Sequence, residues 1–255
     1  MYKRQGLDYR FNGGSFVGLA VGYIDSDNDA FGNLGGTTTN GYSATLYSTW
    51  QHNNFFLDAS LSAGDLDLDL ERVILLPEPL DGQSQLVATG ETDSEYVTAT
   101  VGLGYDFNLK RNGLTGFLRA NATEADVRGF TETGAGGFNL VMSDQTAESL
   151  LAEAGFEWVR PVSFSWGVFQ PVLRLSYFHE FDNDARLVTG RFALDATGSQ
   201  FVILTEDPDR DFLTAGAGFT LTLKRNKSLF LLYETDLERD DLDVSKISFG
   251  ARFQF

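Results

Sequence analysis

Apolar and polar side chains alternate with a period of two residues along most of the chain. The pattern is most regular in the last ten residues, KISFGARFQF. Successive side chains of a β-strand point to opposite faces of the sheet. The segment is therefore predicted to be a terminal strand with one polar face and one apolar face, the latter formed by Ile247, Phe249, Ala251, Phe253 and Phe255.

Ten further segments alternate in the same way, and most have about nine to twelve residues. They lie at 2–11, 15–24, 41–50, 55–64, 96–107, 114–123, 150–159, 166–181, 212–223 and 229–237. This is the length that a tilted strand needs to cross a bilayer, whereas no apolar run approaches the ~20 residues of a transmembrane helix. The pattern predicts an all-β transmembrane antiparallel barrel with eleven strands in this chain.

The phase of the alternation reverses after Gly64. Leucine and aspartate now alternate from Asp65 to Leu70, with the leucines at even positions instead of odd ones. A shift of one residue exchanges the two faces of a strand. The reversal predicts either a β-bulge at this point or a strand that leaves the membrane there.

Long and short connections alternate between the predicted strands, and they differ in charge. The long loops, at 25–40, 65–95, 124–148, 180–211 and 236–243, hold 30 of the 36 acidic residues. The tight turns, at 11–16, 50–55, 107–114, 160–165 and 223–228, hold none, and all three tryptophans lie beside them. Long extracellular loops, short periplasmic turns and interfacial aromatic residues are typical of outer-membrane barrels. A soluble β-sandwich or propeller does not account for this one-sided distribution.

Composition agrees with an exported barrel. The chain has no cysteine, which suits an oxidising compartment. Its mean hydropathy of −0.15 is compatible with a barrel, because alternation hides the apolar face from an average. The opening MYKRQ is followed by no apolar run and so is not a secretory signal. We therefore expect the chain to be a mature piece or a fragment of a longer precursor.

Catalytic and metal-binding motifs are weak. Neither GxSxG nor HExxH occurs. His52 lies in a predicted turn. His179 precedes Glu180, but neighbouring strand residues face opposite sides, so His179 is interpreted as an interfacial residue and the chain as a non-enzyme. No cofactor and no nucleic-acid partner are expected.

An acidic stretch after the second strand imitates the start of a calcium loop. Asp25, Asp27 and Asp29 have the spacing of EF-hand ligands, but Ala30 and Gly36 occupy positions where that loop needs glycine and glutamate. The stretch is predicted to be a solvated acidic loop, and no metal site is expected.

Charged residues on the polar faces are the better functional candidates. Ionisable groups inside a barrel need water or a partner. Two interpretations stay open for them: ion pairs that hold the wall together, or a role in transport. The predicted pore-lining residues are Arg119, Glu153, Glu157, Arg174, Glu180, Glu234, Asp236 and Arg252.

Several ordered motifs resemble the C-terminal β-barrel translocator domain of bacterial autotransporters, which are type V secretion proteins. They are GLDYRFNGGSFVGLAVGYIDSD, QPVLRLSYFHEFDNDARLVTGRF, DPDRDFLTAGAGF and the terminal ARFQF. The resemblance covers nearly the whole chain. It implies a twelve-stranded barrel in the outer membrane of a Gram-negative bacterium, with a lumen helix joined to an exported N-terminal passenger.

The chain departs from that family in two ways. No lumen helix or passenger precedes Tyr2, and GLDYRF belongs near the end of the family's second strand. Residues 1–255 are therefore expected to form a single translocator domain that lacks its first strand. Eleven strands agree with this, because a single-chain barrel with both ends in the periplasm has an even number. We expect either a parallel seam or a gap beside residues 2–11.

The resemblance also implies a function and partners. The barrel would support export and surface display of a linked passenger. The barrel-assembly machinery would recognise the terminal strand through Phe249, Phe253 and Phe255, and outer-membrane lipid and lipopolysaccharide would surround the wall. The alternative is a stand-alone porin-like channel for small solutes, which shares every strand-level feature.

Overall fold

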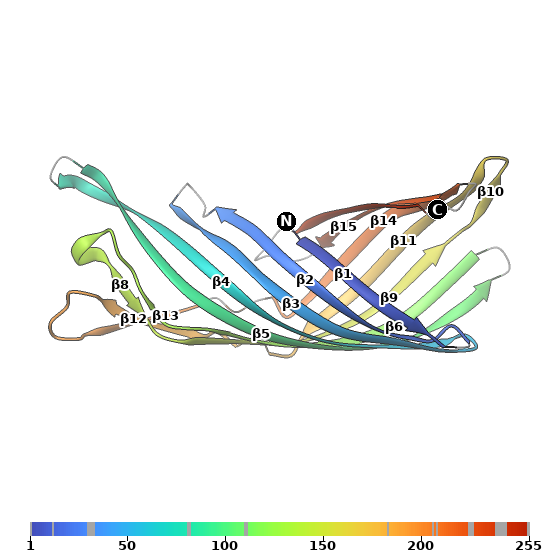
Figure 1. The fold of residues 1–255 in the computed structure, drawn as a ribbon, viewed down its shortest axis with the longest axis horizontal. Helices are drawn as coiled ribbons and strands as arrows, with labels where there is room; N and C mark the ends of the chain where they lie inside the picture. The colour runs from blue at the N-terminus through green and yellow to red at the C-terminus, as the bar shows by residue number, and fades with distance from the viewer. Residues whose placement is uncertain are drawn as a thin grey trace.

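The computed structural model describes residues 2–11, 13–29, 34–80, 83–109, 112–182, 184–205, 207, 209–223, 227–237 and 244–253. Its main element is one antiparallel sheet that curves into an open half-barrel (Figure 1). Eleven strands follow one another in the sheet: β1 (Tyr2–Arg10), β2 (Phe16–Asp29), β3 (Gly35–His52), β4 (Phe55–Leu80), β5 (Gln83–Leu109), β6 (Asn112–Val127), β9 (Gln145–Val159), β11 (Gly167–Glu180), β14 (Asp211–Leu223), β15 (Lys227–Leu237) and β16 (Ser245–Phe253). A short strand, β10 (Val162–Phe164), also pairs with β11. The predicted eleven-stranded all-β architecture is confirmed.

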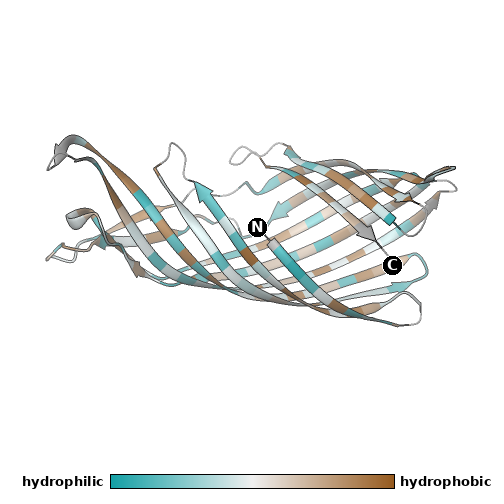
Figure 2. Ribbon diagram, turned by 45° about the horizontal axis from the view of Figure 1, so that its top comes forward, coloured by the Kyte–Doolittle hydropathy of each residue, from teal (hydrophilic) through white to brown (hydrophobic). Residues whose placement is uncertain are grey.

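The two faces of the sheet have different chemistry. Side chains on the convex face are apolar and exposed over most of each strand, as Leu46, Leu61 and Val101 illustrate. Side chains on the concave face are polar and shielded, and Ser43 and Thr45 are buried there. The hydropathy colouring shows the alternation as bands along each strand (Figure 2). Among the described residues no helix is long and apolar enough to span a membrane.

The sheet has two open edges. β1 pairs only with β2, and β16 pairs only with β15; no described residue of β1 pairs with β16. The expectation of a gap beside residues 2–11 is therefore confirmed. That a further strand fills this gap stays a prediction.

The strand β4 passes Gly64 without a bulge. Gly64 lies opposite Ser43 on one side and Tyr96 on the other, in a register that continues unbroken from Phe55 to Leu75. Of the two predicted alternatives the β-bulge is wrong, because the chemistry of the side chains changes while the backbone geometry does not. That the strand leaves the membrane here stays a prediction. The aspartates after Gly64 lie on the convex face, the same face as Leu61. The leucines between them lie on the concave face.

Much of the predicted long loops is strand. β2 and β3 stay paired as far as Asp29 and Gly36, and β4 and β5 continue far beyond their neighbours (Figure 1). Asp25, Asp27 and Asp29 thus lie on the convex face of β2, so the predicted loop at these residues is wrong, whereas Asp27 and Asp29 are exposed as expected. Main-chain hydrogen bonding, once established between two strands, extends as long as both keep an extended backbone.

The loops predicted at 124–148 and 180–211 together form a second small sheet. It contains β7 (Phe130–Thr131), β8 (Leu140–Met142), β12 (Leu187–Phe192) and β13 (Gln200–Leu204), in the order β13-β12-β8-β7. A 3-10 turn, η2 (Gly136–Phe138), connects β7 to β8. We call this unit the outer sheet. It lies at the same end of the molecule as the tips of β4 and β5 (Figure 1).

Candidate functional site

A buried glutamate lies at the centre of the concave face. Glu153 on β9 is only 6 % exposed. Its carboxylate accepts hydrogen bonds from Arg119 Nη1 on β6 and Arg174 Nη2 on β11, both at 2.8 Å, and from Ser176 Oγ at 2.7 Å. Three neighbouring strands are thereby joined through one side chain. The hydrogen bonds satisfy the carboxylate and remove the penalty that an unpaired buried charge would cost.

An aromatic ring supports the two arginines. The guanidinium carbon of Arg174 lies 4.9 Å from the centroid of the Phe117 ring, and that of Arg119 lies 5.6 Å from it. Both distances fall in the range of cation–π attraction. A Cβ on Gly155 would come within 2.4 Å of Phe117 Cζ, so a glycine is needed where the ring crosses β9. Two cations share one carboxylate here, and the cluster keeps a positive charge on the concave face.

Acidic and basic residues alternate along the next row of the concave face. Arg174 lies directly opposite Glu157 on β9 and, on its other side, opposite Gly216 on β14. Gly216 lies opposite Glu234 on β15, which in turn lies opposite Lys246 on β16. Opposite charges on facing strand positions attract, so this row supports pairing between strands as well as polarity.

Two of the remaining predicted pore-lining residues, Glu180 and Asp236, lie on the same face. Glu180 is 8 % exposed and accepts hydrogen bonds from Ser149 Oγ at 2.6 Å and from the Leu150 amide at 2.7 Å. Asp236 accepts one from Thr214 Oγ1 at 2.8 Å. Arg252 is placed on β16 opposite Ser228, but its side chain is outside the described residues. Their lining of a pore stays a prediction.

Two of the three residues of the predicted assembly signal lie on β16, the strand at one open edge of the sheet. Phe249 on β16 is among the most exposed large apolar residues of the convex face. Phe253 is the last residue of β16, and Phe255 lies outside the described residues. Recognition of this strand by an assembly machinery stays a prediction.

His179 has a partner that the sequence did not indicate. Its Nδ1 lies 2.7 Å from Asp211 Oδ1 on β14, and the Tyr177 hydroxyl donates to the same oxygen. The three side chains are on the convex face, and Glu180 points the other way. Asp211 was missed because 32 residues separate it from His179, and only the pairing of β11 with β14 brings them together.

The convex face changes from apolar to acidic at a definite level. The apolar stretches run over 55–63 on β4, 97–107 on β5, 114–122 on β6 and 150–158 on β9, which is nine to eleven residues. Carboxylates follow on the same face of each strand, where the sequence pattern had suggested loops. This acidic collar consists of Asp25, Asp27, Asp29, Asp65, Asp67, Asp69, Glu71, Glu91, Asp93, Glu95, Glu124, Asp126 and Glu148.

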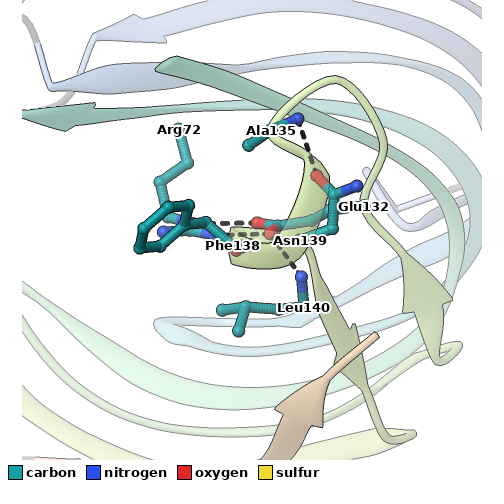
Figure 3. A network of polar contacts seen from close by, with 6 residues as sticks. All are labelled: Arg72, Glu132, Ala135, Phe138, Asn139 and Leu140. Carbon is teal, nitrogen blue, oxygen red and sulfur yellow. Dashed lines mark hydrogen bonds and ion pairs between the residues drawn. The ribbon is translucent and has the colours of Figure 1, made fainter. Parts of the chain in front are cut away.

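A second buried glutamate joins the outer sheet to β4 (Figure 3). Glu132 is only 7 % exposed. Its carboxylate accepts hydrogen bonds from Arg72 Nε at 2.9 Å, from Arg72 Nη2, and from the Leu140 amide at 2.8 Å. Arg72 Nη2 also donates to the Phe138 carbonyl at 3.0 Å. The hydrogen bonds from Arg72 to Glu132 raise the pKa of Arg72. We call this contact the Arg72–Glu132 clasp.

Main-chain bonds add to the clasp. Thr89 on β5 and Thr133 exchange both amide-to-carbonyl bonds, at 2.9 and 2.8 Å. The Arg128 amide donates to the Asp93 carbonyl at 3.0 Å. The outer sheet thus continues the wall of the half-barrel. Within the described part of the chain, no group of three or more His, Cys, Asp or Glu residues is arranged to hold a metal ion.

Comparison with known proteins identifies similar chains. An uncharacterised protein from the trpE-trpG intergenic region of Pseudomonas putida is 28 % identical over 83 % of this chain and 33 % of its own length. Esterase EstA of Pseudomonas aeruginosa is 26 % identical over 94 % of this chain and 36 % of its own length. The chain thus spans about a third of the length of the curated relatives it matches.

A solved structure has the same fold. The translocator domain of the autotransporter NalP from Neisseria meningitidis superposes with a TM-score of 0.71 at 12 % identity, covering all of this chain and 80 % of that one. The family model of the autotransporter beta-domain matches residues 5–234, most of the described sheet. The chain belongs to the autotransporter beta-domain family.

Proposed function

We propose that this chain is the outer-membrane translocator of an autotransporter and supports export and surface display of a linked passenger. The observation that carries the proposal is the wall itself. Its convex face is apolar for nine to eleven residues per strand and ends in carboxylates, while its concave face is polar. A strand of that length crosses the hydrocarbon layer when tilted. A wall of this kind separates lipid outside from water inside.

The charges of the concave face suit the passage of an unfolded chain. Arg119 and Arg174 are already paired with Glu153, and Glu157 and Glu234 flank Arg174. Side chains that satisfy one another keep the interior hydrated and leave few strong sites to retain a moving polypeptide. The structural and the transport interpretations of these residues are thereby compatible, since the same pairs hold the wall and line the path.

Closure and assembly complete the proposal. The edges of β1 and β16 would leave main-chain N–H and C=O groups in lipid, at several kcal/mol for each unsatisfied group. One further strand, antiparallel to both, would close the barrel. The barrel-assembly machinery would recognise β16, whose Phe249 would face lipid, and insert the barrel into the membrane. Lipopolysaccharide would surround the part of the barrel that lies in the outer leaflet.

The proposed function assigns no catalysis to the barrel. The name esterase is that of the relative from Pseudomonas aeruginosa, and this chain matches only about a third of that protein. A stand-alone channel would have the same wall, but the curated relatives are about three times longer than their matched part, which favours a linked passenger.

The proposal can be tested in cells. The chain is expressed from its own gene together with whatever the reading frame encodes before Met1. Single cysteines replace Asp27, Gly198 or Asn53. We expect an impermeant maleimide to label Asp27→Cys and Gly198→Cys on intact cells but not Asn53→Cys, and external protease to release a passenger. Labelling of Asn53→Cys alone would reverse the orientation. A gene that encodes only a signal peptide before Met1 would exclude the passenger and favour the channel.

A further inference from the structure

The two edge strands of the outer sheet, β7 and β13, differ in whether their free edge is covered. β7 is covered, because the adjoining Thr133 pairs with Thr89 of β5. β13 pairs with β12 along Gln200–Leu204, and no described residue pairs with its other side. An unpaired strand edge is a template for another strand, and proteins usually protect it with charges, proline or a covering segment. β13, with the sequence QFVIL, carries none of these residues.

The backbone groups at the open edge can be assigned. The Thr205 amide donates to the Arg186 carbonyl at 2.9 Å, so residues 205, 203 and 201 direct their main-chain groups towards β12. In an antiparallel pair, alternate residues bond to opposite sides. Val202 and Leu204 therefore direct their N–H and C=O groups away from β12, towards the open edge.

The side chains of this edge are apolar and exposed on both faces. Val202 is 57 %, Ile203 53 % and Leu204 64 % exposed. Val202 and Leu204 lie on the face of Thr189 and Leu187, and Ile203 lies on the other. An added strand would bring main-chain partners to the free groups and cover apolar side chains on both faces, which is the combination used in recognition by strand addition.

Hydrogen bonds at two places order the open edge of β13. The Arg72–Glu132 clasp and the Thr89–Thr133 pair fix the outer sheet to the wall. Asp195 accepts bonds from the Thr197 and Ser199 amides, both at 2.8 Å, and so orders the turn that leads from β12 to β13. A preordered edge loses little conformational entropy on binding.

We infer that the open edge of β13 binds an extended apolar segment of the exported passenger by strand addition as the segment leaves the barrel. The inference rests on the proposed translocator function. Two observations favour this occupant over a second copy of the chain. The outer sheet continues the wall from which a passenger would emerge, and about two thirds of the length of the curated relatives lies outside the part that matches this chain.

The test uses photo-crosslinking in the full product of the gene. A benzophenone amino acid replaces Val202 or, as the matched control, Thr189. Thr189 lies directly opposite Val202 on the same face, but its carbonyl is already bonded to the Ser143 amide at 3.1 Å. We expect irradiation during export to join the passenger to the barrel from position 202 and not from 189, with the linked peptide mapping to an apolar extended segment.

A proline variant tests the main-chain contact. Val202→Pro removes one free N–H at the open edge and no bond to β12, whereas Val202→Thr keeps the N–H. We expect Val202→Pro to lower the rate at which the passenger becomes protease-resistant by roughly 2- to 10-fold, the effect of one net hydrogen bond. Val202→Thr should leave it within twofold, and heat-modifiable migration of the barrel should be unchanged in both.

The outcomes separate the two proposals. A passenger that reaches the surface without any crosslink from position 202, or with equal folding in the proline variant, refutes strand addition and leaves the translocator function standing. A crosslink from 202 to a second barrel refutes it in favour of a dimer edge. If no passenger appears on the surface of cells with the unmodified chain, the translocator function itself fails.

Discussion

The lower and upper halves of β4 have the same backbone and opposite chemistry. From Phe55 to Ala63 the convex face is apolar and the concave face polar; from Asp65 to Leu70 the convex face is acidic and the concave face carries leucine. The register with β3 and β5 does not shift between the halves. Strand geometry alone decides which side chains point outward, so the two halves differ only in the residues that the sequence places there. This change is what we expect of a strand that passes from lipid into water, as the proposed function requires.

A buried glutamate held by arginine lies at the level of each half of β4, on other strands of the molecule. Glu153 in the lower half joins three strands of the wall, and Glu132 in the upper half joins the outer sheet to β4. The first lies on a polar face open to water, the second beside a small separate sheet. Removing either partner tests a different unit of the fold.

The largest effect is expected for a charge on the convex face of the lower half. Leu61→Arg places a cation in the apolar stretch and should destabilise the barrel by about 2–4 kcal/mol. Asp67→Arg, on the same face of the same strand, should be within about 0.5 kcal/mol of the unmodified chain, because it lies opposite Asp93 in water. Heat-modifiable migration and urea unfolding in liposomes measure both. Equal losses in the two variants would contradict the assigned membrane boundary.

The next effect is expected at the Arg72–Glu132 clasp. Arg72→Ala leaves the Glu132 carboxylate buried with only the Leu140 amide as a partner. An unsatisfied buried group costs roughly 1–3 kcal/mol. We expect faster hydrogen exchange and protease cleavage in the outer sheet, with unchanged unfolding of the wall. Loss of the wall's heat resistance would show that the clasp serves the whole barrel.

Glu153 provides the counterpart in the lower half. Glu153→Ala leaves Arg119 and Arg174 without their shared carboxylate, but water on the concave face can solvate both. The cost should therefore be smaller than a fully buried pair would give, about 1 kcal/mol or more, and should appear in the unfolding of the wall. Glu153→Gln, which keeps the side-chain size and one accepting oxygen but removes the charge, is the comparison variant. A change confined to the outer sheet would contradict the placement.

The smallest effect is expected at Asp195. Hydrogen bonds from Thr197 and Ser199 hold the pKa of this carboxyl below its ordinary value. A lowered folded-state pKa adds stability above the ordinary carboxyl pKa of about 3.9 and loses it as pH falls through the folded value. We expect Asp195→Ala at pH 7 to speed hydrogen exchange at Thr197 and Ser199, and we expect acidification of the unmodified chain to have the same effect. Exchange that is independent of pH, after correction for intrinsic rates, would exclude this role.

The terminal and spanning strands could be predicted from the sequence because their signal is local. Period-two alternation at Lys246–Phe253, and tight turns such as Asn53, need only neighbouring residues and the strand geometry. The concave positions of Arg119, Glu153 and Arg174 follow from the same periodicity. The prediction that the acidic segment after Gly64 forms a loop is wrong at Asp65–Asp69, which pair with β5. A strand continues wherever a neighbouring strand offers main-chain hydrogen bonds, whether or not its side chains are apolar.

By itself, therefore, the sequence determined the eleven strands of the wall, their two faces and the family resemblance, all of which depend on residues close together in the chain. Only the tertiary structure decided that Glu153 lies between two arginines, that Asp211 meets His179 and that Arg72 clasps Glu132 across 60 residues. It also decided that two long connections form the outer sheet with an open edge at β13. The physical reason is the same in each case: the partner is set by strand register and sheet order, which no local pattern of side chains encodes.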